Sequence, residues 1–321
     1  MDDWIARKDL IEPRRLKALS QRSDLRGWSQ VLSQLGALGL TGYAIHALWG
    51  SWWVAPVFVA HGVILWGFCY AGQHELGHWT VFRSKALNDA FGHLASFPRF
   101  YAHNYQRFFH FAHHRHTKVA GHDPELLAQR PWTRWSYLKF VAGPALWIAQ
   151  VRNLAEHALG HAPEPFLKER DRRIVIREAR LYVLGYAAVV ALSAYFGSWA
   201  ALLCVWGPMM LTTCFYRCYV AAEHHGLPNG QGIIGGTRTT RAGPLLRWLM
   251  WQMPYHTEHH LFPGVPFHRL GALSRELRER PESRLAGANE VAPGYIAVNL
   301  ALIAMLRRGD DPTDLAHAQR A

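Results

Sequence analysis

The stretch WVAPVFVAHGVILWGFCYAGQHELGH, residues 53–78, joins a long apolar run directly to a pair of histidines. Residues 53–72 contain no Asp, Glu, Lys or Arg, and a helix needs about 17 to 25 mostly apolar residues to cross a bilayer. His74 and His78 follow four positions apart, so on a helix their imidazoles share one face. The stretch therefore predicts a membrane helix that ends in two metal-binding side chains.

Two further histidine clusters, each with the spacing H-x-x-H-H, occur downstream: His110, His113 and His114, then His256, His259 and His260. This spacing also places the imidazoles of each cluster on one side of a helix. A single zinc ion takes about four ligands, so eight or more imidazoles exceed one metal and fit two metals with open positions. Imidazole binds iron, zinc, copper and nickel, so the ligand type leaves the metal open.

Apolar residues are concentrated in four blocks, because half of the chain is hydrophobic while the mean hydropathy is only −0.09. The blocks form two pairs, each joined by a short uncharged turn with tryptophan beside it, as an interfacial aromatic belt would place it. We therefore predict an all-α membrane protein with four transmembrane helices in two hairpins, the alternative being buried helices of a soluble protein. The blocks are 31–49 and 53–72 in hairpin 31–72, and 181–196 and 199–222 in hairpin 181–222.

Charge predicts the orientation of these hairpins. Residues 80–180 contain 16 Lys and Arg against eight Asp and Glu, whereas the two turns contain no basic residue. The positive-inside rule then places both termini and the central segment in the cytoplasm, in a multi-pass protein of a bacterial inner membrane. All three histidine clusters fall on this side, in a helical cap of residues 73–180 and 223–270. Segments 1–30 and 271–321 flank a domain of residues 31–270, which contains the hairpins and the cap.

The three clusters resemble the histidine boxes of membrane fatty acid desaturases. The resemblance rests on GQHELGH (72–78), RFFHFAHHRHT (107–117) with Asp123 and Pro124 following, and YHTEHHLFP (255–263). It implies a non-haem di-iron centre under a four-helix transmembrane stalk, with ligands that are almost all histidine. A ninth ligand is implied near the last span, where Glu223-His224-His225-Gly226 resembles the E-H-x-G stretch of bacterial alkane monooxygenases. We assign His224, and leave open whether His225 joins or replaces it.

The expected metal ligands are therefore His74, His78, His110, His113, His114, His224, His256, His259 and His260, around two iron ions with O2 as co-substrate. The resemblance implies a lipid or acyl substrate that enters from the bilayer. It also implies an external electron donor, a ferredoxin or cytochrome b5-type protein with its reductase. The net charge of +12 fits anionic lipid and an acidic donor; no nucleic-acid recognition motif is present, so we expect no nucleic acid.

Several alternatives stay open at this level. The second box and the tail after the third favour a desaturase, whereas the first box and Glu223-His224 favour a hydroxylase of the same superfamily. The motif H-E-x-x-H at 74–78 also fits a zinc protease, but a protease needs one further ligand and has no use for six more histidines. Glu75 then orients a metal ligand or is only a polar residue beside the site. Asp123 and Arg107 likewise either orient a ligand or are simple loop residues.

A metal carrier is the remaining alternative, and it belongs to a non-enzymatic class. Carriers place their ligands along a path through the spans, near the membrane midplane. Here the predicted ligands gather at one edge of the spans. The clusters therefore favour an oxidase over a transport protein.

Overall fold

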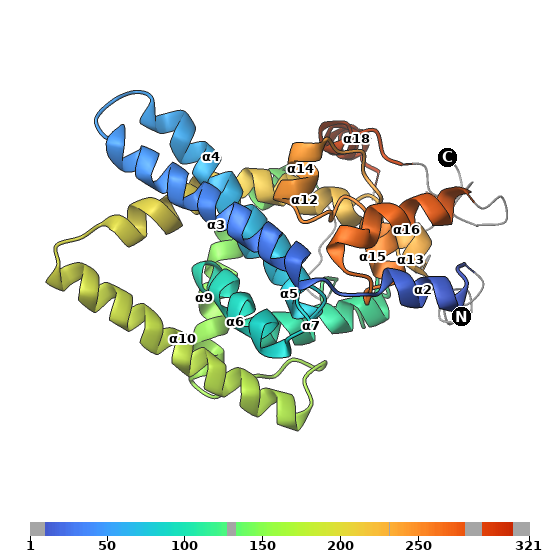
Figure 1. Ribbon diagram of the computed structural model, residues 1–321, viewed down its shortest axis with the longest axis horizontal. Helices are drawn as coiled ribbons and strands as arrows, with labels where there is room; N and C mark the ends of the chain where they lie inside the picture. Colours follow the sequence, from blue (N-terminus) through green and yellow to red (C-terminus); the bar gives the residue numbers. More distant parts are fainter. Residues whose placement is uncertain (1–9, 127–132, 231, 280–290, 311–321) are drawn as a thin grey trace. The chain divides into compact units, whose positions relative to one another are not determined.

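The computed structural model describes residues 10–126, 133–230, 232–279 and 291–310, and its regular structure there is helical (Figure 1). Two isolated β-bridges, Thr239 with Tyr255 and Thr240 with Ala292, are the β contacts in these ranges. The all-α fold class is confirmed for this part of the chain. The chain divides into two compact units, which we call the long-helix unit (residues 25–109 and 139–217) and the histidine unit (residues 1–24, 110–138 and 218–321).

The long-helix unit contains the apolar helices and the segment with the first histidine pair. Its elements are α3 (Asp24–Ala47), α4 (Val54–Trp66), the π-helix η1 (Gly67–Gly72), α5 (Gln73–Gly77), α6 (Lys85–Ser96), the 3-10 turn η2 (Phe97–Arg99), α9 (Pro144–Ala158), α10 (Glu169–Tyr195), the π-helix η3 (Leu202–Trp206) and α11 (Gly207–Leu211). Three helices belong partly to each unit: α7 (His103–His116), α8 (Arg134–Ala142) and α12 (Thr213–His224).

The histidine unit consists of shorter helices around the second and third histidine clusters. Besides parts of α7, α8 and α12 it contains α2 (Pro13–Leu19), α13 (Gly232–Gly236), α14 (Pro244–Leu249), α15 (His256–Leu261), α16 (Phe267–Glu279) and α18 (Tyr295–Arg308). One carboxylate anchors α15, because Glu258 accepts hydrogen bonds from Thr239 at 2.5 Å, Ser274 at 2.6 Å and Arg278 at 3.1 Å. This anchor holds the backbone of the third cluster against α16.

One of the predicted spans is present as a continuous apolar helix. The helical run Val54–Gly77, made of α4, η1 and α5, is long and apolar enough to cross a membrane, and it is the one such run among the described residues. Helices α3, with 24 residues, and α10, with 27, are at least as long as this run but begin with charged residues. The fourth block is interrupted at Thr212, where the backbone leaves helical geometry. Among the described residues, one helical run therefore has the length and apolar composition of a membrane span.

Close backbone approach packs the two predicted hairpins together within the long-helix unit. A Cβ on Gly62 of α4 would lie 2.3 Å from the carbonyl oxygen of Pro208 in α11, so only glycine fits there. His61 lies with Nδ1 2.6 Å from the hydroxyl of Thr41 and Nε2 2.7 Å from the carbonyl oxygen of Cys204. The buried His61 thereby joins α3, α4 and η3.

Candidate metal centre

Three helix segments of the histidine unit carry seven of the nine predicted ligands. Helix α7 carries the second cluster, and α15 carries the third over fewer than two turns. Helix α12 ends at His224, and Gly226 follows with φ +73°, a left-handed conformation that commonly terminates helices. Helix α12 therefore ends with His224 on its last turn.

A first group of imidazoles gathers around His224. One ligand nitrogen from each of His113, His224 and His260 lies within 4.8 Å of the other two. Nε2 of His224 is 3.2 Å from Nε2 of His113 and 2.8 Å from Nε2 of His256. All four side chains are buried. Residues separated by more than a hundred positions in sequence thus place their ring nitrogens around one point.

The outer ring nitrogen of each of these four histidines faces an oxygen. The pairs are Nδ1 of His113 with Asp123 at 2.9 Å, of His224 with the carbonyl of Gly236 at 2.9 Å, of His260 with the hydroxyl of Thr117 at 3.2 Å, and of His256 with Glu223 at 3.4 Å. Metal-bound histidines usually donate their second N–H to such an oxygen, which fixes the tautomer and the ring direction. The arrangement leaves the Nε2 lone pairs directed inward.

The inward-facing nitrogens fit a cation. Burial lowers the pKa of His224 and of His260 well below the ordinary value, with nearby histidines contributing in the same direction. Both rings are therefore neutral, which is the form that binds metal. Nε2 of His260 is buried without a hydrogen-bond partner among the described residues, and a buried unsatisfied nitrogen is costly. A metal ion among these lone pairs would satisfy them.

His113 differs from its neighbours because two carboxylates surround it. Burial opposes its charged form, but Glu125 and Asp123 outweigh burial and raise the pKa of His113 to about 9. Asp123 is itself buried and also accepts the backbone N–H of Lys118 at 2.8 Å. The carboxylate therefore stabilises positive charge on this ring, whether a proton or a metal supplies it. Of the two roles left open for Asp123, the contact supports that of an orienting residue.

A second group lies beside the first. Nε2 of His114 is 2.8 Å from Nε2 of His110 and 3.1 Å from Nε2 of His259. The rings of His114 and His260 are stacked with centroids 4.0 Å apart, so the two groups are neighbours within the histidine unit. Two adjacent sets of imidazoles suit two metal ions better than one, since a tetrahedral site takes about four ligands.

The remaining two predicted ligands lie in the long-helix unit. His74 is buried on α5, and His78 directly follows this helix; their ring centroids are 5.3 Å apart. Glu75 contacts Nδ1 of His74 at 3.3 Å and accepts the hydroxyl of Thr80 at 3.3 Å. Burial, aided by His74 and Arg107, lowers the pKa of His78 well below its ordinary value. The first pair thus places two imidazoles one helical turn apart.

His225 is absent from both groups found among the described residues. Three contact residues had no assigned role in the sequence: Thr117, Glu223 and Gly236. Thr117 lies four positions after His113 and so on the same helix face, and Glu223 directly precedes His224, so their positions were signals that could have found them. Gly236 acts through its backbone carbonyl, which every residue type possesses, and the sequence has no signal for it.

Known proteins that resemble this chain in sequence are lipid desaturases. The sequence profile of the fatty acid desaturase family matches residues 9–291. Two relatives named sn-1 oleoyl-lipid 12-desaturase, from Synechocystis sp. and Anabaena variabilis, are 24% and 26% identical, each over 82% of this chain and 79% of their own length. A relative from Nostoc sp. named sn-1 acyl-lipid omega-3 desaturase (ferredoxin) is 23% identical over 71% of this chain and 68% of its own.

Proposed function

This chain belongs to the fatty acid desaturase family, and from that premise we propose that it inserts a double bond into an acyl chain of a membrane lipid, using O2. Family membership makes it an oxidoreductase of lipid metabolism. The observation that carries the proposal is the pair of adjacent imidazole groups around His224 and His114. Relatives named as acting on lipid-bound acyl chains support the substrate class.

Two iron ions would be held by the nine predicted histidines. His113, His224, His256 and His260 would hold one ion, and His110, His114 and His259 would contribute to the other; His74 and His78 of the long-helix unit are the remaining two predicted ligands. The inward lone pairs and the outer partners of the first group support this division. When bound, the irons supply the activation of O2 that an unactivated C–H bond requires.

The protein's own residues position and tune these ligands. Asp123, Thr117 and the carbonyl of Gly236 hold the Nδ1 side of three rings, so each ring keeps one tautomer and one direction. Burial keeps the rings of His224 and His260 neutral, and the buried surroundings exclude bulk water from the C–H chemistry. Forming one double bond while O2 is reduced to two waters consumes two electrons and two protons from outside the substrate.

The proposed site of action is the cytoplasmic boundary of a bacterial inner membrane, which the chain crosses as two hairpins. The run Val54–Gly77 supports one span. Large apolar side chains are exposed on the long-helix unit, as lipid contact would require: Leu32, Leu40, Tyr43, Trp52, Trp53, Leu184, Val190 and Leu192. A cavity of about 570 Å³ between α10 and η3, lined by Phe100, Tyr186, Val189, Ala194, Leu202 and Trp206 among others, suits hydrocarbon.

A separate protein supplies the electrons in this proposal. A relative carries ferredoxin in its name, which supports a ferredoxin as the donor. A cytochrome b5-type protein is the other donor class. A reductase would reduce either donor. The basic balance of the chain, +12 overall, favours association with an acidic donor through long-range attraction.

Iron content and product mass test the proposal together. Purified protein is analysed for metals, and cells that express it are compared by lipid mass spectrometry with cells that express His113→Ala. We expect about two irons per chain and an acyl product lighter by two hydrogens that is absent from the variant. A product heavier by one oxygen would instead make the protein a hydroxylase. Zinc near one per chain would contradict the iron site.

A further inference from the structure

The helical run Val54–Gly77 ends in the short helix α5, which carries His74 and is directly followed by His78. Helix α5 has five residues; the π-helix η1 precedes it, and Trp79 follows at φ +57°. A left-handed backbone is costly for a bulky residue, so surrounding contacts must hold it. We propose that Arg99 and Arg107 are positioning residues that clamp the two ends of α5 and thereby set the directions of His74 and His78.

The first clamp holds the start of α5. The buried guanidinium of Arg99 donates through Nη1 to the carbonyl of Cys69 at 3.2 Å and to the side-chain oxygen of Gln73. Cys69 belongs to the π-helix and Gln73 is the first residue of α5. Arg99 therefore spans the junction between the two helix types, directly beside His74.

Gln73 also connects the start of α5 to two further segments. Its amide donates to the hydroxyl of Ser96 at 2.5 Å and to the carbonyl of Tyr101 at 3.2 Å. Nη2 of Arg99 also donates to the hydroxyl of Tyr216 at 3.3 Å. The residue before His74 thus has its polar atoms engaged on both sides, which leaves the start of α5 little freedom to rotate.

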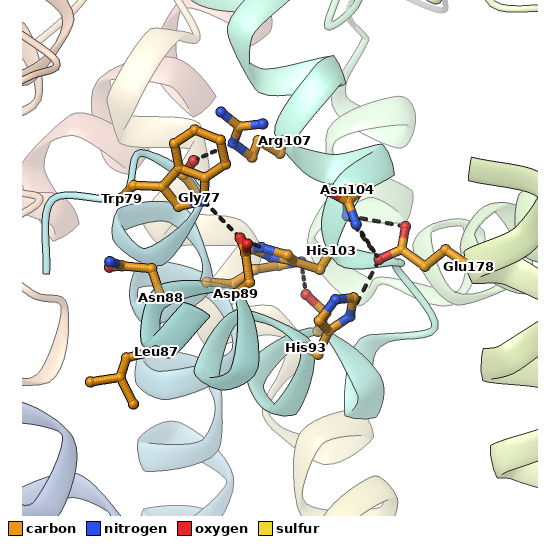
Figure 2. A network of polar contacts seen from close by, with 12 residues as sticks. Gly77, Trp79, Leu87, Asn88, Asp89, His93, His103, Asn104, Arg107 and Glu178 are labelled. Atoms are coloured by element: carbon orange, nitrogen blue, oxygen red, sulfur yellow. Dashed lines mark hydrogen bonds and ion pairs between the residues drawn. The ribbon is translucent and has the colours of Figure 1, made fainter. Parts of the chain in front are cut away.

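The second clamp holds the end of α5 (Figure 2). Arg107 donates through Nε to the carbonyl of Gly77 at 2.8 Å, and its guanidinium lies 3.4 Å from the ring centre of Trp79. The last carbonyls of a helix have no partner within the helix and attract cations. Gly77 and Trp79 flank His78, so Arg107 holds the backbone on both sides of this ligand.

Trp79 is supported from its other sides as well. Its indole N–H donates to Asp89 at 2.7 Å, and Nζ of Lys85 lies 4.1 Å from its ring centre. Asp89 also contacts Nε2 of the fully buried His103 at 3.3 Å, as Figure 2 shows. These contacts stabilise the left-handed turn, so the chain leaves the site at a defined angle after His78.

The arrangement matters because α5 is the last turn of the helical run Val54–Gly77, where the final carbonyls have no partner within the helix. The imidazoles of His74 and His78 lie one turn apart at the two ends of this turn. Loss of either clamp would let one imidazole turn while the fold of the longer helices is kept. The inference rests on the proposed function in one respect, namely that His74 and His78 bind iron.

Arg107→Lys and Arg99→Lys test the clamps, because each keeps the charge and loses the planar donor fork. The control is Arg173→Lys, an exposed arginine of α10. Amide hydrogen exchange of the full-length protein, followed over residues 73–80, reports the backbone without requiring iron. The Mössbauer spectrum of 57Fe-loaded protein and the separate values of kcat and KM report the centre.

We expect faster exchange confined to residues 73–80, an altered iron spectrum, and a fall in kcat of about 10- to 100-fold at unchanged KM, in either clamp variant. Trp79→Phe, which keeps stacking but loses the bond to Asp89, serves as a milder third variant should Arg99→Lys fail to fold. Wild-type exchange and spectrum in Arg107→Lys and Trp79→Phe would overturn the inference, and so would exchange that rises equally throughout the chain. Wild-type protein without iron would overturn the proposed function, while the exchange data would still decide the clamps.

Discussion

Asp123 lies in the loop that follows α7 and contacts the buried imidazole of His113. Its carboxylate is almost fully buried. A buried charge is tolerated in proteins when it is paired and hydrogen-bonded. Here His113 and the backbone N–H groups of Lys118 and Glu125 are the partners. The charge of this residue is therefore available to strengthen His113 as a donor, in the way that carboxylates behind metal-bound histidines do.

Asp123→Asn should weaken metal binding. Asparagine keeps one of the two oxygens that accept the backbone N–H groups of Lys118 and Glu125, and it removes the negative charge behind His113. We expect metal affinity to fall about 10- to 100-fold, measured as iron retained against a chelator series. Glu169→Gln, which changes an exposed carboxylate at the start of α10, is the control. Equal iron retention in both variants would show that Asp123 only shapes the loop.

Glu178 makes stability depend on pH. Burial, partly offset by hydrogen bonds from Asn104, raises the pKa of Glu178 from 4.5 to about 7. Between these values the folded protein holds a proton that the unfolded chain releases, so its contribution to stability is full below pH 4.5 and is lost as the pH rises toward 7. The ionised carboxylate is then the less favourable form in the fold.

Glu178→Gln removes this ionisation. We expect the melting temperature of the variant, relative to wild type, to be higher at pH 8 than at pH 5, as followed by thermal unfolding in detergent. The neutral amide keeps an oxygen for Asn104 at both pH values. A difference that is the same at pH 5 and pH 8 would contradict the raised pKa.

At the scale of elements, the packing of α4 on α11 depends on the absence of a side chain. Gly62 lies against the backbone of Pro208, and the hydroxyl of Thr212 is equally close to where a Cβ would be. Backbone atoms cannot move aside as the end of a flexible side chain can. This contact is therefore a sensitive measure of whether the two predicted hairpins pack as described.

Gly62→Ala should separate these helices. Overpacking of this kind costs about 1 to 3 kcal/mol, so we expect a lower melting temperature and a lower yield of folded protein. Gly39→Ala in α3 is the matched control, because a Cβ there meets no atom within 4 Å. Similar melting temperatures for the two variants would mean that α4 and α11 are not in this contact.

At the scale of the whole molecule, the charge distribution is the feature that predicts membrane topology. The turns 50–52 and 197–198 lack basic residues, whereas the segments before, between and after the hairpins are rich in them. Such asymmetry orients membrane proteins with the basic segments in the cytoplasm. The four-span topology is thus a prediction that can be tested without any knowledge of the site.

Reporter fusions test this topology. Alkaline phosphatase, which is active only outside the cytoplasm, should be active when fused after Ser51 or Ser198 and inactive when fused after Lys85 or Arg308. A fluorescent protein that folds in the cytoplasm should give the opposite pattern. Phosphatase activity after Lys85 would place the first histidine pair on the wrong side of the membrane and contradict a shared cytoplasmic site.

The sequence by itself determined the helical class, the family and the residues able to bind metal, because each depends on local spacing. His110 and His114 lie four positions apart and so share a helix face whatever surrounds them, and Gly226 ends α12 through its own backbone preference. Local composition was a weaker guide to the number of membrane spans. Block composition predicted four, whereas one continuous run of apolar helix, Val54–Gly77, is long and apolar enough among the described residues.

Only the tertiary structure decided which imidazoles meet and what stands behind them. His224 and not His225 faces His113 and His256, because helix α12 ends at that residue and the two rings leave the backbone in different directions. The carbonyl of Gly236 and the hydroxyl of Thr117 became ring partners through chain packing. Contacts between residues far apart in sequence depend on the path of the whole chain, and no local pattern encodes that path.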